Sequence, residues 1–362
     1  MRANFENFKI EIFGESHAEE IGVRLINLPV GIEIDVKKIQ AELDRRKSGN
    51  NVWSTPRKEE DKAEILSGIS NGKTDGKEFV AIIKNNNKKS GDYDDLKYKP
   101  RPSHADYAAK MKFGLDYDMA GGGKFSGRMT APIVIAGSVA KQILKKYGIF
   151  IGGYVSSIAS IKATSYRERI INENELKEVS KQAFPVLSQN VKEIMEKAIL
   201  LAKNNGDSVG GTVDCIVYNL FSGVGDFLFD GMESKISSSL FAIPAVKAVE
   251  FGLGTDLANK FGSEVNDEFV YENGVVGTKT NNNGGINGGI SNGMPITMRV
   301  TVKPTPSISK VQNTIDLFTK ENTQIEIKGR HDACIVPRAV APIESAVALA
   351  ILDLVLRKDY IK

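Results

Sequence analysis

The sequence has little net charge and few cysteines, and each shortage excludes a class of protein. Among its 362 residues, 48 basic side chains stand against 45 acidic ones, so the formal net charge is only +3. Nucleic-acid-binding domains usually carry a clustered basic excess. We therefore expect no nucleic-acid partner, and any anion-binding site must be local. Two cysteines, Cys215 and Cys334, cannot form a disulfide framework, and a reducing, cytoplasmic location is expected.

Long apolar runs are missing as well. The longest apolar segment, residues 339–356, carries Glu344 and Asp353, so it predicts a buried helix and not a membrane span. Residues 1–17 lack the apolar core of a signal peptide. We therefore expect no membrane partner.

Nucleotide-binding fingerprints are absent too. The chain has no GxGxxG motif, which argues against a dinucleotide-binding Rossmann domain. Residues 68–74, GISNGKT, resemble a P-loop, but only three residues separate the glycine from GK, where a P-loop has four. A strand is predicted for residues 78–84, where a P-loop would continue as a helix. We expect a hairpin turn here and not an ATP- or GTP-binding switch.

Short strands in hairpins, mixed with helices, predict an α+β architecture in a single domain, residues 1–362. Alternating residues predict strands over 8–13 and 22–28. A helix is predicted from an N-cap at Asp35 through Lys47. Residues 235–250 begin with serines and are expected to continue as an apolar helix.

The stretch 280–296, TNNNGGINGGISNGMPI, is too rich in glycine and asparagine for regular structure. Residues 294–302, which are β-branched and alternate in polarity, predict a strand that leaves it. Two interpretations stay open. The stretch can be a backbone cradle for a flat or anionic ligand, or a long flexible hairpin loop.

The only three histidines, His17, His104 and His331, each lie in a short polar motif: GESH, RPSHAD and GRHD. Any one of them could be a hydrogen-bonded structural residue. Three such motifs in one chain favour a functional site.

Two basic segments have a structural and a functional interpretation. Residues 121–131, GGGKFSGRMTA, precede a predicted helix through Lys146, and a helix N-terminus favours anions; the alternative is an ordinary glycine-rich cap. Arg45 and Arg46 end the helix that begins near Asp35. They either complement the helix dipole or bind a phosphate or carboxylate.

Taken together, these motifs resemble those of the chorismate synthase family. The resemblance spans residues 14–342 in the order expected for the family. It rests on GESH, DRRKSG, RPSHAD, GGGxxSxRxTA, AVKAVEFGLG, GGINGGISNGMPI, KPTPS and GRHDACIVPRA.

The resemblance implies a lyase that converts 5-enolpyruvylshikimate 3-phosphate to chorismate and phosphate, the last step of the shikimate pathway. The reaction is a formal 1,4-anti-elimination that needs reduced FMN (FMNH2) without net redox change. The family fold places a helical layer between two antiparallel β-sheets. Family members assemble as homotetramers, and no metal is implied.

The resemblance also assigns roles to residues. A phosphate and two carboxylates on the substrate call for arginines, because guanidinium groups bind oxyanions bidentately. His104 is the candidate acid for the departing phosphate, His17 acts beside the flavin, and Asp332 helps to remove the ring proton through the flavin. The substrate-binding candidates are Arg46, Arg101, Arg128 and Arg338. The FMN contacts map onto Lys124, Phe125, Ser126, Ser238, Ser239, Gly288, Lys303, Pro304, Thr305, Pro306, Ser307 and Arg330.

The chain departs from the family pattern at Ala18, Ser103 and Lys124 without losing a proposed catalytic group. Arg46 matches one proposed NADPH contact, but Val52 replaces the arginine at a second. An external flavin reductant is therefore expected. The alternative function is a catalytically inactive flavin-binding protein of the same fold, and the presence of both catalytic histidines and of the acidic candidate argues against it.

Overall fold

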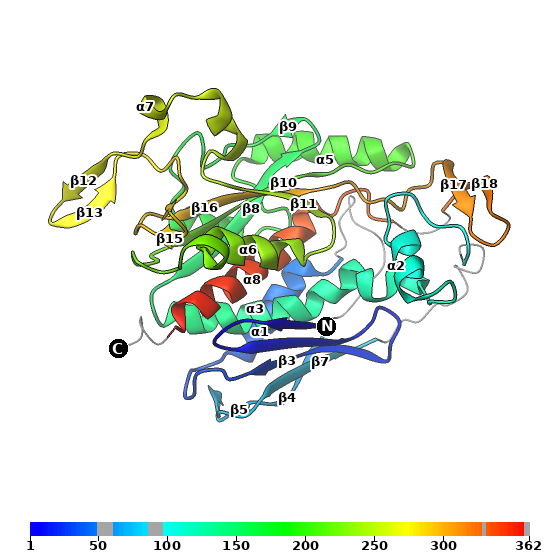
Figure 1. The fold of residues 1–362 in the computed structure, drawn as a ribbon, viewed down its shortest axis with the longest axis horizontal. Coiled ribbons are helices and arrows are strands. Elements are labelled where there is room, and N and C mark those ends of the chain that lie inside the picture. The colour runs from blue at the N-terminus through cyan, green and yellow to red at the C-terminus, as the bar shows by residue number, and fades with distance from the viewer. Residues whose placement is uncertain (49–60, 86–96, 328–330, 358–362) are drawn as a thin grey trace.

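The protein is represented by a computed structural model that describes residues 1–48, 61–85, 97–327 and 331–357. Within these residues a layer of helices lies between two five-stranded antiparallel sheets (Figure 1). One large hydrophobic core runs through the helices and reaches both sheets. The predicted α+β architecture, a helical layer between two antiparallel sheets, is confirmed.

The first sheet has the strand order β1-β2-β3-β7-β4. The predicted hairpin of strands 8–13 and 22–28 is confirmed, with each strand shifted by one or two residues. Side chains at alternate positions of β3 are buried, because successive residues of a strand point to opposite faces of the sheet. The segment 68–74 is the predicted hairpin. The strands are Arg2–Asn4 (β1), Lys9–Gly14 (β2), Glu20–Ile26 (β3), Ala63–Ser67 (β4), Ile69–Ser70 (β5), Lys73–Thr74 (β6) and Phe79–Lys84 (β7).

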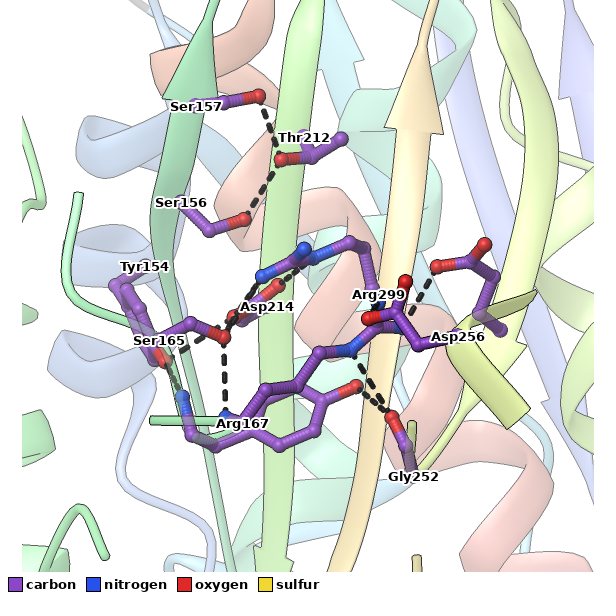
Figure 2. A network of polar contacts seen from close by, with 12 residues as sticks. Tyr154, Ser156, Ser157, Ser165, Arg167, Thr212, Asp214, Gly252, Asp256 and Arg299 are labelled. Carbon is purple, nitrogen blue, oxygen red and sulfur yellow. Dashed lines mark hydrogen bonds and ion pairs between the residues drawn. The ribbon is translucent and has the colours of Figure 1, made fainter. Parts of the chain in front are cut away.

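The second sheet has the order β11-β16-β10-β8-β9 and is covered on both faces. Its inner face packs on the helical layer. On the outer face, apolar side chains pack beside a network of polar contacts centred on Asp214 (Figure 2). The elements are Phe150–Ile158 (β8), Ile161–Lys162 (β9), Gly211–Tyr218 (β10), Val246–Phe251 (β11), Ile296–Val302 (β16), and the helices Glu173–Val179 (α4) and Gln189–Asn204 (α5).

The helical layer is formed mainly by α1 (Val36–Arg46), α3 (Thr130–Lys145), α6 (Met232–Phe241) and α8 (Val336–Val355). Asp35 caps α1 as predicted, accepting a hydrogen bond from the backbone of Lys37. Every residue of helix α8 except Arg338 is buried, including Glu344 and Asp353, which confirms the predicted buried helix. Among the described residues, no helix is long and apolar enough to cross a membrane.

The prediction of one helix over residues 235–250 is wrong in its second half. Helix α6 ends at Phe241, and residues 246–251 are the strand β11, which pairs with β16. Pro244 cannot donate a helical hydrogen bond, and Ala245 adopts a left-handed conformation with φ of 73°, so the chain turns between α6 and β11. Pairing with a neighbouring strand here outweighs the apolar helical pattern.

The remaining elements lie mostly at the two ends of the molecule, with α2, β17 and β18 at one end and β12–β13 protruding at the other (Figure 1). The helix predicted to start near His104 begins at Asp106. These elements are Asp106–Phe113 (α2), Gly262–Val265 (α7), Phe269–Glu272 (β12), Val275–Thr278 (β13), Ile286–Asn287 (β14), Ile290–Ser291 (β15), Gln312–Asp316 (β17) and Glu321–Ile325 (β18), with short 3-10 helices Ala120–Phe125, Gly127–Met129, Leu228–Asp230 and Gly254–Asn259.

The glycine-rich stretch 280–296 forms the small hairpin β14–β15, and its glycines serve mainly to bring backbones together. A Cβ atom on Gly284 would lie 2.4 Å from the backbone nitrogen of Gly252, and one on Gly289 would lie 2.2 Å from a backbone oxygen. Gly288 differs, because a Cβ atom there would meet nothing within 4 Å. Among these glycines, Gly288 therefore remains a candidate for contact with a ligand.

Candidate active site

The triple glycine Gly121–Gly123 lies against the rings of two predicted catalytic histidines. All three glycines have positive φ, at 58°, 86° and 51°. A Cβ atom on Gly121 would lie 2.6 Å from Nε2 of His17, and one on Gly122 would lie 3.7 Å from Nε2 of His104. Conformation therefore favours glycine at all three positions, and at Gly121 the lack of space requires it as well. The structure brings together two histidines that lie far apart in the sequence.

The helix expected directly after the triple glycine begins later. Residues 120–125 and 127–129 are 3-10 turns, and α3 starts only at Thr130. Ser126 separates the two turns and accepts a hydrogen bond from the backbone of Arg128 at 3.3 Å. The predicted anion-friendly helix N-terminus is therefore not formed by the three glycines themselves.

His17 occupies the connection between β2 and β3, as predicted. The backbone nitrogen of Ser16 donates to the carbonyl of Gly123 at 3.4 Å, which joins the GESH loop to the triple glycine. Asn85 links the same loop to an arginine. Its amide nitrogen donates to the carbonyl of Ala18 at 2.8 Å, and its amide oxygen accepts from Nε of Arg128 at 2.9 Å.

His104 is held by the other two charged residues of its motif. Nδ1 of His104 lies 2.6 Å from Asp106, whose carboxylate also accepts from Nε of Arg101 at 2.7 Å. Ser103, where the family commonly has glycine, has a φ of 59°, a conformation that glycine adopts without strain. Lys303 donates to the carbonyl of Ser103 at 2.5 Å, so the KPTPS segment is joined to this motif.

Arg46 and Arg128 converge on one buried carboxylate, Asp61. Nη2 of Arg46 donates to it at 2.7 Å, and Nη1 of Arg128 donates to its other oxygen. The Asp61 side chain is completely buried, at 0% exposure. Burial alone would raise the pKa of Asp61, but the two guanidinium groups outweigh it and hold the pKa below its usual value.

Asp332, the carboxylate predicted to help remove the ring proton, is paired with Arg338. The two side chains form an ion pair at 2.6 Å, and Nε of Arg338 donates to the backbone carbonyl of Arg46 at 3.0 Å. Arg338 is also the one residue of α8 that is not buried. Each of the four predicted substrate-binding arginines thus pairs with a carboxylate, so part of their positive charge is already balanced.

His331 differs from the other two histidines. Its Nε2 atom is buried and has no hydrogen-bond partner among the described residues. Burial is the largest cause that lowers the pKa of His331, and the nearby charge of Arg101 acts in the same direction. His331 is therefore a neutral imidazole near the Arg101 cluster. Arg330 and Val52, which the sequence singled out, lie outside the described residues.

The predicted FMN contacts fall at two separate places. The segment 303–307 follows β16, and Ser307 accepts from Arg101 at 3.4 Å, so this part lies beside His104. Gly288 precedes the same strand. It lies in the turn of the β14–β15 hairpin, where the carbonyl of Gly289 accepts from the backbone nitrogen of Met232 at the start of α6. Ser238 and Ser239 lie on α6, where Ser239 donates to the carbonyl of Lys235 at 3.2 Å.

Two residues of this cluster were not singled out from the sequence. Asp106 stood inside the RPSHAD motif, and its acidic side chain two residues from a histidine was an available signal. Asp61 lies in a charged stretch with no distinguishing pattern, fifteen residues from Arg46 and sixty-seven from Arg128. Only the tertiary structure brings it between the two arginines.

Comparison with known proteins identifies the family. The model of a family described as chorismate synthase matches residues 8–356. A chorismate synthase from Dehalococcoides mccartyi is 44% identical over 354 residues, which cover 98% of this chain and 96% of the relative. One from Methanocaldococcus jannaschii is 43% identical, with the same coverage. A solved structure, "Crystal Structure of Chorismate Synthase", superposes with a TM-score of 0.77 at 27% identity, covering 98% of this chain and 93% of that one. The chain therefore belongs to the chorismate synthase family.

Proposed function

We propose that this chain eliminates phosphate from 5-enolpyruvylshikimate 3-phosphate to form chorismate, by a 1,4-anti-elimination that depends on reduced FMN. As a member of the chorismate synthase family, the chain is a carbon–oxygen lyase of the shikimate pathway and of aromatic amino acid biosynthesis. The observation that carries the residue assignment is the position of His17 and His104 against one triple-glycine loop. Two proton-transferring groups on one glycine-rich surface suit an elimination that moves protons at two centres.

His104 is the acid in this proposal. When the carbon–oxygen bond to phosphate breaks, the departing phosphate gains negative charge, and an imidazolium within hydrogen-bond reach can give it a proton. Nε2 of His104 faces the backbone of Gly122, where the missing side chain leaves room for a reacting group. Asp332 assists the removal of the ring proton in the second half of the reaction, and its ion pair with Arg338 holds the carboxylate in place.

The described residues fit an anionic, flat cofactor. Phe125 is 38% exposed beside the triple glycine, and two cations, Lys124 and Lys303, belong to the adjoining segments. Reduced flavin, when bound, supplies an electron-rich ring that assists the elimination without net oxidation. The chain binds and orients this group through the residues near His104, and Gly288, Ser238 and Ser239 are proposed as further contacts.

An anaerobic assay tests the proposal. With chemically reduced FMN, we expect chorismate and phosphate to appear in equal amounts while the flavin stays reduced. Turnover with oxidised FMN under strict exclusion of reductant would overturn the cofactor assignment, as would oxidation of one flavin for each chorismate formed. Tight flavin binding without any phosphate release would identify an inactive flavin-binding protein instead, which no observation favours.

We also propose that an external reductant supplies the reduced flavin. Arg46 matches one nicotinamide contact, is 2% exposed and is bound to Asp61, and Val52 replaces the arginine at the second contact. Anaerobic mixing of the protein with oxidised FMN and NADPH should leave the flavin absorbance unchanged. Bleaching at a rate comparable to turnover would show that this proposal is wrong.

Assembly as a homotetramer in the cytoplasm completes the proposal. Large apolar side chains are exposed on the protruding hairpin β12–β13 and on the turn around residues 227–229, and such patches mark surfaces that bind partners. The exposed side chains are Phe227, Leu228, Phe229, Phe269, Tyr271, Val275 and Val276. Sedimentation equilibrium should give four times the chain mass, and a monomer at micromolar concentration would contradict it.

A further inference from the structure

We propose that Asp106 is a positioning residue that fixes the tautomer and the orientation of the His104 ring. The proposal rests on the proposed role of His104 in the elimination. It assigns a task to a carboxylate that has no role of its own in the reaction proposed above.

The two oxygens of Asp106 are shared between Arg101 and His104. One oxygen, Oδ2, accepts from both the backbone nitrogen and Nε of Arg101, at 3.0 and 2.7 Å. The other oxygen, Oδ1, accepts from Nη2 of Arg101 at 2.8 Å and lies 2.6 Å from Nδ1 of His104. The Asp106 side chain is 5% exposed, so water does not compete for these bonds.

This arrangement dictates where the His104 proton resides. Nη2 of Arg101 also lies 3.2 Å from Nδ1 of His104, but it donates to Oδ1 of Asp106 at the shorter distance of 2.8 Å. A carboxylate only accepts hydrogen bonds, so Nδ1 has to carry a proton to make its 2.6 Å contact with Asp106. The opposite nitrogen, Nε2, is then the one that exchanges its proton, and it points toward Gly122. Burial would raise the pKa of Asp106, but hydrogen bonds from Arg101 and His104 hold it well below its usual range. Asp106 thus stays ionised at neutral pH.

Arg101 anchors the carboxylate. Two nitrogens of its guanidinium and its backbone nitrogen all bind Asp106. The remaining guanidinium nitrogen donates to Ser307 at 3.4 Å, a long contact. The Asp106 side chain does not cap α2, although the residue lies at the start of this helix. Its contacts therefore serve the His104 ring more than the helix.

The variant Asp106→Asn changes the tautomer in a way that the geometry specifies. Two donors of Arg101 converge on the Oδ2 position, so the asparagine oxygen has to occupy that position. The amide nitrogen then takes the place of Oδ1, where it loses the hydrogen bond from Nη2 of Arg101 and donates to Nδ1 of His104. The neutral ring is left with its proton on Nε2, the wrong tautomer, as happens in serine proteases when the triad aspartate is replaced by asparagine.

Nitrogen-15 NMR of the histidine rings measures this directly, because the chain has only three histidines and His104→Ala identifies the His104 signals. In the unmodified protein, neutral His104 should carry its proton on Nδ1, and in Asp106→Asn it should carry it on Nε2. The wild-type spectrum alone shows which ring nitrogen of neutral His104 carries the proton. The proposal can therefore be tested even if Asp106→Asn does not fold. A neutral His104 with its proton on Nε2 in the wild type would overturn the proposal.

Kinetics separate positioning from a general structural role. We expect Asp106→Asn to lower kcat by roughly 10²–10⁴-fold, with KM changed little. The double variant His104→Ala/Asp106→Asn should be no slower than His104→Ala alone, because Asp106 acts through His104. If the fold-reductions in kcat of the two single variants multiply in the double variant, the proposal is wrong. If the protein forms no chorismate at all, the proposed function fails, while the NMR result still decides the role of Asp106.

Discussion

Two clusters of buried charged side chains in this protein are built from the same kinds of residues, carboxylates bound by arginines, but have different functions. Around Asp214, adjacent strands of the second sheet supply the partners, so that neighbouring side chains on one face satisfy one another (Figure 2). Around Asp61 and Asp106, a loop and the first turn of α2 supply the carboxylates, and the arginines beside them adjoin glycines and histidines. In the first network the register of the strands places the partners side by side. In the second, the ring nitrogens of His17 and His104 lie beside the glycines 121–123.

The difference shows why burial and charge alone do not identify a site. Asp214 is 0% exposed and accepts hydrogen bonds from Arg299, Tyr154 and Ser165. Burial and this carboxylate together raise the pKa of Tyr154 well above its usual value, so the phenol stays protonated and donates. No histidine belongs to that network, and its function is to hold three strands and a loop together.

The largest expected effect is on catalysis, from the two histidines. His104→Ala should slow turnover by roughly 10²–10⁴-fold, the usual contribution of general acid catalysis. Thermal stability and substrate affinity should change little, since the arginines supply most of the charge complementarity. His17→Ala should also slow turnover and should disturb the spectrum of bound reduced flavin more. If His104→Ala melts at a lower temperature while its folded fraction turns over normally, His104 is only structural.

A matched pair of aspartates compares the two clusters. Asp61→Asn and Asp214→Asn should each lower the free energy of unfolding by about 3–5 kcal/mol, because each leaves a buried arginine without its carboxylate. Only Asp61→Asn should also reduce the kcat/KM of the folded protein, by roughly 10²-fold, because it releases Arg46 and Arg128. Urea denaturation and steady-state kinetics give both quantities. An equal loss of kcat/KM in the two variants would show that the two clusters do not differ in function.

A pair of glycines tests whether the triple-glycine loop holds His17 in place. In Gly121→Ala, the new methyl group would overlap the His17 ring, which lies 2.6 Å from the Cβ position, so the ring must move and activity should fall by roughly 10²-fold. Gly72→Ala is the control, because its φ is 74° and nothing lies within 4 Å. It should cost about 1–2 kcal/mol of stability and leave kcat unchanged. Full activity in Gly121→Ala would contradict the site geometry.

The smallest expected effect is a pH dependence of stability that comes from Asp61. Its folded pKa lies below the value of about 3.9 found in unfolded chains. The carboxylate therefore stabilises the fold above that pH, and the stabilisation is lost as pH falls through the folded pKa. The difference in unfolding free energy between the wild type and Asp61→Asn should stay constant from pH 7 to about pH 4 and should narrow as pH falls further. A constant difference would show that Asp61 is not ionised in the fold.

The sequence predicted the parts of the fold that depend on local patterns. Alternation located the β2–β3 hairpin, and the cap at Asp35 and the apolar segment 339–356 located two of the central helices. The prediction failed at Ala245, where pairing with β16 overrides a helical pattern. Pro244 inside the predicted helix was a local signal of the break, whereas the pairing with β16 leaves no such signal.

The candidate site was predictable only where its residues lie in motifs. His17, His104 and the arginines could be named from the sequence, but the carboxylates that bind those arginines could not be assigned to them. The glycines posed a similar problem. Composition cannot distinguish Gly284, which lies against another backbone, from Gly122, which lies against a histidine ring.

A crystal structure with oxidised FMN and 5-enolpyruvylshikimate 3-phosphate bound would test the location of the site most directly. We predict that both ligands lie against Gly121–Gly123 and that an oxygen of the substrate phosphate lies within hydrogen-bond distance of Nε2 of His104. Ligand density confined to the β14–β15 hairpin or to the outer face around Asp214, with His104 contacting only protein, would contradict the proposed active site.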